Sequence, residues 1–581
     1  MDALLWQFSA SSSMAREMRP RPTKPGKFRV PFRETSIIVL AAVLVYLPAL
    51  RGGFVFDDWI LLIQQPLIHA SDGLWRIWFT TEARECYPIT WTICWLQWQQ
   101  WGDNPFGYHV VNVLLHAANA VLVFRVLKRL EVRGAWLAGL LFAVHPVNVA
   151  AVAWISEQKT TLAMLFFLTA VLSYLRFEKD QRRGWYILSV GCYLLSLLAK
   201  PAAVMWPVVL LLLVWWRRRR VTRSDLVQCL PFALLSLVIA PLTVWFQTAR
   251  VLEWETARAD GFLARLAGAG WAVCFYLFKA LVPVRLSMIY PKWEIDPANV
   301  LVYLPGLLLV AGLACCWRKR TTWGGDILAG GGYFVLMLFP VLGFFDIGFY
   351  RYSLVADHWQ YLAIPGVIAL AASGAARIMA RSTERRRAGV ARALGTALVI
   401  TLGGLTWVQS GVYLNDETLW RDTLAKNPNA WLAHYNLGLQ LAAKGELSEA
   451  TEAYEKAVRL KPDYADALGN LGVALAQQGR MEEAITRWQA ALRCQPDHVE
   501  TLNNLGTAYA RRGDLKRAEL YFSLVLTVQP NDTDAHANLG MVYRSQGKLT
   551  QAIEQFQAAL RADPMNQVAR RALAQLGVPG P

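Results

Sequence analysis

The chain has 581 residues, of which 55% are hydrophobic, with 25 tryptophans and a formal net charge of +17. This length allows two or more domains, and this apolar content excludes an ordinary soluble protein. The positive charge lies in short blocks between apolar segments, as in the cytoplasmic loops of membrane proteins, and not along an aromatic and basic face that would bind nucleic acid. We therefore expect an integral membrane protein without a nucleic-acid partner.

The N-terminal residues 1–35 are basic and contain several prolines. They lack the pattern of a cleavable signal peptide, so we predict a cytoplasmic tail followed by a signal anchor. The eight cysteines form no CxxC motif and no paired Cys/His spacing, so no metal site is predicted from them. If the chain between Cys86 and Cys94 is helical, these residues lie about 12 Å apart, too far for a disulfide.

Residues 36–413 form the predicted membrane domain. Segments long enough to cross a bilayer, roughly 17 to 25 residues each, lie near 36–51, 107–127, 134–153, 160–177, 184–200, 201–216, 225–247, 299–317, 327–345, 359–379 and 391–412. A further stretch, Gly261 to Val284, is either a twelfth span or an interfacial helix. Eleven spans keep every arginine-rich block cytoplasmic, whereas twelve move the last two outside. We therefore predict eleven spans and a non-cytoplasmic C-terminus.

The first outer loop, residues 52–106, is rich in tryptophan. Trp91, Trp95 and Trp98 follow the spacing of one face of a helix. Because tryptophan prefers the headgroup level, this pattern predicts helices that lie flat on the membrane. The alternative is a soluble loop with scattered aromatic residues.

From Asn427 onward the sequence is soluble in character and repeats every 34 residues, most clearly at Pro428, Pro462, Pro496, Pro530 and Pro564. The period and its pattern of small and aromatic residues are typical of tetratricopeptide (TPR) repeats, which we place at 431–464, 465–498, 499–532 and 533–566. A connecting helix is expected within 414–430, and residues 567–581 form a C-terminal cap. Stacked repeats build a superhelix with a concave groove, so we expect a protein or peptide partner.

One residue type recurs at the same position of the first helix of each repeat: Asn436, Asn470, Asn504 and Asn538. A side-chain amide offers both a donor and an acceptor, so these residues are predicted to hold an extended peptide backbone in the groove. The alternative is that asparagine only belongs to the repeat consensus.

Ionisable groups at the outer ends of membrane spans are the candidates for chemistry. Asp57 and Asp58 follow the first span, and two adjacent carboxylates near a low-dielectric surface can leave one of them as a general base. Lys159 and Lys200 lie at other outer ends, where an ammonium can hold a lipid phosphate; the alternative is a snorkelling lysine. The other candidates on this side are His145, Glu157, Arg351, Asp357 and His358. Their convergence on one side of the membrane predicts an active site there.

Several stretches resemble the transmembrane and TPR-containing protein O-mannosyltransferases of the GT-C glycosyltransferase superfamily. They are Phe54 to Trp59, Tyr108 to His116, Phe142 to Lys159, Leu197 to Pro207, Asp357 to Pro365 and Asp416 to Gly438. The resemblance implies an all-α fold in which a GT-C-like membrane bundle precedes a TPR α-solenoid, and a donor sugar carried on a polyprenyl phosphate. It also implies that Asp57 or Asp58 is the base and that Lys159, Lys200 and Arg351 bind the donor phosphate. A divalent metal is possible, but no residue pattern supports one.

We therefore predict an enzyme that transfers a sugar from a polyprenyl-phosphate donor to a protein or glycan hydroxyl outside the cytoplasm, with the TPR groove recruiting the acceptor or a partner. The alternative is a non-catalytic membrane scaffold for envelope protein complexes. The absence of a cleavable signal and the basic loops favour a bacterial inner membrane, with the repeats in the periplasm.

Overall fold

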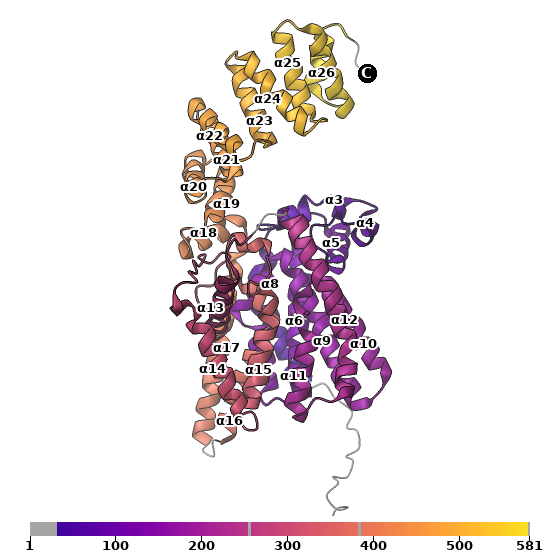
Figure 1. Ribbon diagram of the computed structural model, residues 1–581, viewed down its shortest axis with the longest axis vertical. Helices are drawn as coiled ribbons and strands as arrows, with labels where there is room; N and C mark the ends of the chain where they lie inside the picture. Colours follow the sequence, from indigo (N-terminus) through magenta and orange to yellow (C-terminus); the bar gives the residue numbers. More distant parts are fainter. Residues whose placement is uncertain (1–31, 254–256, 382–384, 579–581) are drawn as a thin grey trace, which may run out of the picture.

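The computed structural model describes residues 32–253, 257–381 and 385–578, so most of the predicted basic tail lies outside the described residues. Within these ranges the regular elements are helices, without a β-strand. Figure 1 shows two parts: a bundle of long helices, and the TPR repeats extending from one end of it. The predicted all-α membrane bundle with a C-terminal TPR solenoid is confirmed.

The bundle consists of α2 (Phe32–Val45), α6 (Pro105–Arg129), α7 (Ala135–Ala143), α8 (Val149–Ala153), α9 (Gln158–Asp180), α10 (Arg183–Ala199), α11 (Trp206–Arg218), α12 (Arg223–Phe246), α13 (Phe262–Leu281), α14 (Leu304–Arg318), α15 (Gly324–Leu338), α16 (Pro365–Arg381) and α17 (Arg385–Val412). Seven of the described helical segments are long and apolar enough to cross a membrane, and the bent pair α7 and α8 raises this number to eight. Helices α10 and α16 are shorter and also apolar. The count of eleven spans stays a prediction.

Helix α13 is the segment that the sequence left open between a span and an interfacial helix. Near its start, Arg265 pairs with Asp346 at 2.9 Å, just beyond α15. At its other end, the carbonyl of Ala280 is 3.1 Å from Nε2 of His145, just beyond α7. His145 lies in the break between α7 and α8, within the bent pair that can form one span. Helix α13 is also one of the seven segments that are long and apolar enough to cross a membrane, so its assignment as an interfacial helix stays a prediction.

The basic blocks meet at the opposite end of the bundle. Arg218 forms ion pairs with Glu178 and Asp225, and Arg377 pairs with Asp326 at 2.5 Å. A side-chain nitrogen of Arg219 donates to the carbonyl of Arg320 at 2.6 Å. Loops that are distant in sequence therefore place their positive charge on one side, as cytoplasmic loops do.

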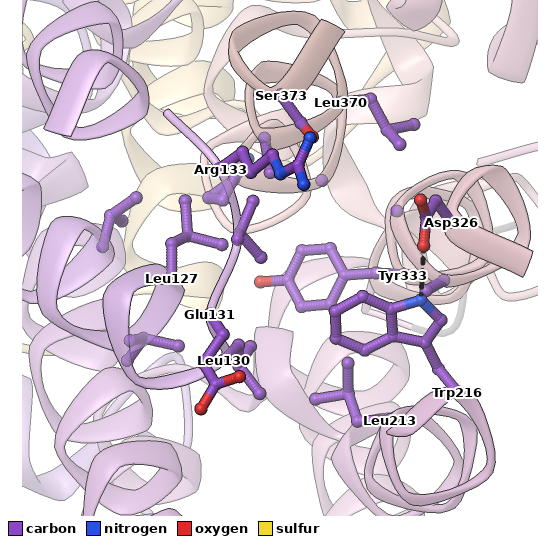
Figure 2. A pocket seen from close by; sticks show the side chains of 18 of the residues that line it. Leu127, Leu130, Glu131, Arg133, Leu213, Trp216, Asp326, Tyr333, Leu370 and Ser373 are labelled. Atoms are coloured by element: carbon purple, nitrogen blue, oxygen red, sulfur yellow. Dashed lines mark hydrogen bonds between the residues drawn. The ribbon is translucent and has the colours of Figure 1, made fainter. Parts of the chain in front are cut away.

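A cavity of about 720 Å³ lies between α6, α9, α11, α15 and α16. Its walls are mainly apolar, with Leu127, Leu213 and Tyr333 among them (Figure 2). Trp216 donates to Asp326 at 2.9 Å at the end near the basic blocks. The residues that line this cavity include none of the candidate carboxylates at the outer end of the bundle.

The outer loop folds into the π-helical turn η2 (Trp59–Ile63) and the helices α3 (Pro66–His69), α4 (Gly73–Phe79) and α5 (Pro88–Trp101). Trp91 is buried, Trp95 donates to the carbonyl of Ala70, and Trp98 stacks on His69. These three tryptophans therefore pack within the loop, and the position of its helices flat on the membrane stays a prediction. The loop has enough apolar residues to form a core of its own, and α5 packs its tryptophans into that core. The exposed aromatic residues of the loop lie mainly on α4, at Trp75, Trp78 and Phe79.

The C-terminal part begins with the connecting helix α18 (Asp416–Lys426). Four helix pairs follow: α19 (Trp431–Ala443) with α20 (Leu447–Leu460), α21 (Ala465–Gln477) with α22 (Met481–Cys494), α23 (Val499–Arg511) with α24 (Leu515–Val528), and α25 (Thr533–Ser545) with α26 (Leu549–Ala562); α27 (Gln567–Gln575) packs on the last pair. A Cβ on Gly438 would lie 2.6 Å from the ring of Tyr454, so glycine there lets the two helices of the first pair meet. Gly472 and Trp488 repeat this contact in the next pair.

Candidate active site

The candidate carboxylates Asp57 and Asp58 lie on a tight turn between η1 (Leu47–Arg51) and η2. Phe56 in this turn has a φ of +53°, in the left-handed region that a bulky side chain rarely adopts. Such a conformation persists where the surroundings fix it, and it often marks a functional site. The turn therefore has a defined shape that orients the two carboxylates.

Asp58 is completely buried and its carboxylate is fully hydrogen-bonded. The backbone N–H of Ser156 donates to Oδ1 at 2.7 Å, the Ser156 hydroxyl donates to the same oxygen, and the N–H of Val55 donates to Oδ2 at 3.0 Å. Burial, followed by the charge of Asp57, raises the pKa of Asp58. With both oxygens occupied, Asp58 fastens the turn to η4 (Ile155–Glu157).

Asp57 differs because its buried Oδ1 has no hydrogen-bond partner among the described residues. Burial raises the pKa of Asp57 to about 7, against the opposing charge of Lys159 and with the help of Glu157 and Glu85. A carboxylate with an unoccupied oxygen and a pKa near neutrality suits a general base. Of the two neighbours, Asp57 is the better candidate for the base.

Two lysines meet around one buried glutamate. Nζ of Lys200 donates to Oε2 of Glu157 and to Oγ1 of Thr160, each at 2.8 Å. Nζ of Lys159 lies 3.8 Å from Oε1 of Glu157 and 3.1 Å from Oε2 of Glu85. The lysine side chains are only 10% and 15% exposed, so their charges are neutralised by carboxylates and hardly by water. We call Glu85, Glu157, Lys159 and Lys200 the charge cluster.

His358 lies at the edge of the charge cluster, with Nε2 at 3.8 Å from Oε1 of Glu157. Burial lowers the pKa of His358 to about 3, so the imidazole is neutral at physiological pH. Its neighbour Asp357 instead accepts from the hydroxyl of Tyr290 at 2.9 Å, and burial raises the pKa of Asp357 to about 7. The structure thus brings His358 to the charge cluster and directs Asp357 to a different contact.

Two further candidates make contacts outside the charge cluster. His145 lies 3.1 Å from the carbonyl of Ala280, and its Nδ1 accepts from the N–H of Val147. Arg351 donates to the carbonyl of Leu252 at 3.2 Å. Glu85 belongs to the charge cluster, yet the sequence analysis did not find it. It lies in an irregular stretch before α5, and only the fold of the outer loop brings it to Lys159.

The four repeat asparagines occupy equivalent places on α19, α21, α23 and α25, and each is partly exposed. The side-chain amide of Asn470 donates to the hydroxyl of Tyr435 at 3.1 Å. Nδ2 of Asn436 has no hydrogen-bond partner within the described part of the chain. Their role in holding a peptide stays a prediction.

Known proteins match both parts of this chain. Residues 88–245 match the family described as dolichyl-phosphate-mannose-protein mannosyltransferase, and tetratricopeptide repeat families match 438–479, 463–531, 503–566 and 537–577. A protein O-mannosyl-transferase of Caenorhabditis elegans is 24% identical over 460 residues, covering 74% of this chain and 63% of that protein. The chain is homologous to the protein O-mannosyl-transferases. Protein O-mannosyl-transferase TMTC4 of Homo sapiens is 25% identical over 506 residues, covering 74% of this chain and 66% of that protein.

This chain therefore spans slightly less than two thirds of the length of these relatives. Among solved structures, the TPR protein YrrB aligns with 27% of this chain and 81% of its own, at 25% identity and a TM-score of 0.25. The residues that match the mannosyltransferase family, 88–245, include Lys159 and Lys200, whereas Asp57 precedes this range.

Proposed function

We propose that this protein is a membrane glycosyltransferase that moves a sugar from a polyprenyl-phosphate donor to a hydroxyl of a protein, on the side of the membrane where the repeats lie. The observation that best supports this proposal concerns Asp57. Its Oδ1 is buried and has no hydrogen-bond partner among the described residues, and the positive charge of Lys159 acts on this carboxylate. This arrangement offers a base beside cations, which are the two functions that the transfer requires. Homology to protein O-mannosyl-transferases supports the same reaction class.

In the reaction, the acceptor hydroxyl attacks the anomeric carbon of the donor sugar from the face opposite the phosphate. Asp57 takes the hydroxyl proton as the new carbon–oxygen bond forms. The bond between the anomeric carbon and the phosphate oxygen breaks, and its electrons leave with the polyprenyl phosphate, so the configuration inverts. General-base assistance of this kind contributes about 10² to 10⁴-fold in rate.

The leaving phosphate gains negative charge, and fixed cations that meet this charge lower the barrier. Lys200 and Lys159 are the cations of the charge cluster, and Glu157 and Glu85 hold both of them in place. The neutral imidazole of His358 can add a hydrogen bond without adding charge. The phosphate would replace part of the contact that each lysine now makes with a carboxylate.

The TPR groove would bind the protein acceptor. Its partly exposed asparagines can bond to any extended backbone, while an acceptor hydroxyl reaches the turn at the base of the repeats. The basic blocks at the far end of the bundle support a cytoplasmic assignment for that end, so the repeats would lie in the periplasm of a bacterial inner membrane.

The alternative is a non-catalytic membrane scaffold, and a transfer assay separates the two. Purified protein in lipid nanodiscs would receive polyprenyl-phosphate mannose and serine- and threonine-containing peptides, with mass spectrometry of the peptides as the readout. We expect wild-type protein to add a hexose, and the exposed outer-loop variant Asp103→Asn to match it. If no peptide and no glycan hydroxyl gains a sugar from any polyprenyl-linked donor, the scaffold becomes the better account.

A further inference from the structure

The turn that carries Asp57 is bonded to the segment that leads into the repeats, far away in the sequence. The N–H of Gly53 donates to the carbonyl of Leu414 at 2.9 Å. The N–H of Phe56 donates to Oδ1 of Asp416 at 2.8 Å, and Nε1 of Trp59 donates to Oδ2 of Asp416 at 3.0 Å. One carboxylate thus joins the residue before Asp57 to the residue after Asp58.

Asp416 does not serve the usual role of an acidic residue at the start of a helix. The side chain of Asn415 already caps α18, accepting from the N–H of Thr418 at 2.9 Å. Asp416 is only 7% exposed and has no ion-pair partner within the described part of the chain. A buried carboxylate without a cation is costly, so a stability role alone explains it poorly. Its Oδ1 instead accepts from Phe56 of the turn and its Oδ2 from Trp59, and Nε2 of Gln440 on α19 also lies 3.5 Å from Oδ2.

The bonds made by Asp416 hold the unusual backbone of Phe56. This residue has a left-handed φ of +53° and directly precedes Asp57 and Asp58. The Phe56 ring packs against Trp420 of α18, with ring centroids 5.3 Å apart. Helix α18 therefore supports this residue through both its backbone and its side chain.

A chain of aromatic contacts also connects Phe56 with the groove of the TPR repeats. Phe56 contacts Tyr352, and Tyr352 contacts Trp431 at the start of the first repeat. Trp431 packs against Tyr464, with centroids 4.9 Å apart, and Tyr464 packs against Tyr435 at the same separation. Tyr435 accepts a hydrogen bond from Asn470, one of the groove asparagines. Aromatic contacts thus connect the groove of the first two repeats with the turn.

We infer that Asp416 is a positioning residue for the transfer reaction: through its bonds to Phe56 and Trp59 it fixes the turn so that the unoccupied oxygen of Asp57 faces the acceptor hydroxyl. This inference rests on the proposed function. It makes the first helix of the TPR segment part of the active-site architecture, so that the repeats not only recruit an acceptor but also complete the site. Misplacing a reacting group by about 1 Å can cost about 10²-fold in rate.

The test uses a mismatch of donors and acceptors. Asp416→Asn keeps the shape of the side chain but replaces one acceptor oxygen with an NH₂ donor, which then faces either Phe56 N–H or Trp59 Nε1–H. Trp59→Phe removes the Nε1–H donor, so in the double variant the amide oxygen can serve Phe56. The NH₂ group then meets only the side-chain amide of Gln440, which can turn its own oxygen toward it. The matched control is Asp422→Asn on the same helix, whose carboxylate pairs with Lys426 at 2.6 Å.

We expect Asp416→Asn to lower kcat by about 10- to 100-fold, with KM for the donor within about twofold of wild type because the charge cluster is intact. The double variant should recover most of kcat, and Asp422→Asn should match wild type. An unchanged kcat in Asp416→Asn would overturn the inference, as would a double variant no faster than Asp416→Asn alone.

Hydrogen exchange on the substrate-free proteins separates this inference from the proposed function. Asp416→Asn should speed exchange in residues 53–60 and leave the repeats unchanged, whether or not any sugar is transferred. Wild-type protein that transfers no sugar would refute the proposed function, while fast exchange in 53–60 would still show that Asp416 holds the turn. Unchanged exchange in 53–60 would refute the positioning role itself.

Discussion

Lys200 donates a hydrogen bond to Glu157 at 2.8 Å, although 43 residues separate them in the sequence. Glu157 is 2% exposed and lies within 3.8 Å of Lys159 and of His358 as well. One buried carboxylate therefore contacts Lys159, Lys200 and His358, the three groups that we propose to meet the donor phosphate. This arrangement holds the cations in place before the donor arrives.

Replacing Lys200 tests the phosphate contact. Burial lowers the pKa of Lys200, but its bond to Glu157 opposes this, and we treat the side chain as a cation that meets the leaving phosphate. Lys200→Gln should lower kcat/KM by about 10² to 10³-fold, the usual loss when one group that stabilises transition-state charge is removed. The control is Lys179→Gln, because Lys179 is exposed and lies at the end of α9 away from the charge cluster. This variant should keep wild-type kinetics. Equal kinetics for the two variants would contradict the assignment of Lys200.

The ion pair between Lys200 and Glu157 should also contribute to the stability of the folded protein. Lys200→Gln leaves Glu157 buried with one partner fewer, and breaking a buried pair costs about 3–5 kcal/mol. Lys200→Gln should therefore melt at a lower temperature in detergent, and Glu157→Gln with Lys200→Gln should recover much of that loss. The double variant should remain inactive because the cation is still absent. If the loss of stability in the double variant instead equals the sum of the losses in the two single variants, Lys200 and Glu157 are not coupled.

The pH dependence of turnover follows from Asp57. Burial raises the pKa of Asp57 to about 7, and only the ionised carboxylate can accept a proton. Below that pKa the ionised fraction falls about tenfold per pH unit, so kcat should fall as pH decreases below about 7 and level off above it. Initial rates between about pH 5 and 9 test this prediction. A flat profile through neutrality would argue against Asp57 as the base.

Topology gives a prediction that is independent of chemistry. If α13 is interfacial and the chain has eleven spans, the arginine-rich blocks are cytoplasmic and we expect Pro581 outside the cytoplasm. In a bacterial host, a C-terminal alkaline phosphatase fusion should be active and a green fluorescent protein fusion should be dark. The reverse pattern would mean that α13 crosses the membrane.

Features with a local or periodic signal could be predicted from the sequence. The 34-residue period identifies the repeats because each repeat uses the same small and aromatic residues to pack its helices, as Gly438 does against Tyr454. Carboxylates and lysines at the outer ends of apolar segments identified Asp57, Glu157, Lys159 and Lys200, because charge is rare at membrane depth.

The missed features depend on contacts between distant segments. Glu85 reaches Lys159 across 74 residues, and Asp416 reaches Phe56 across 360, so neither leaves a local pattern. Helical spacing likewise shows that Trp91 belongs to one face of a helix, and not that the core of the outer loop covers this residue. Whether an aromatic face meets lipid or a loop core is decided by the tertiary fold.

The central claim is that Asp57 is the general base, and turnover of Asp57→Asn beside Asp58→Asn tests it most directly. The measurement is kcat for hexose transfer from polyprenyl-phosphate mannose to peptide, together with donor binding by each variant. Asp57→Asn should fold, bind the donor as wild type does, and lose about 10² to 10⁴-fold in kcat. Asp58→Asn should lose stability as well, because it disturbs three hydrogen bonds within the turn and to η4. An Asp57→Asn protein that binds the donor and transfers sugar at the wild-type rate would contradict the account.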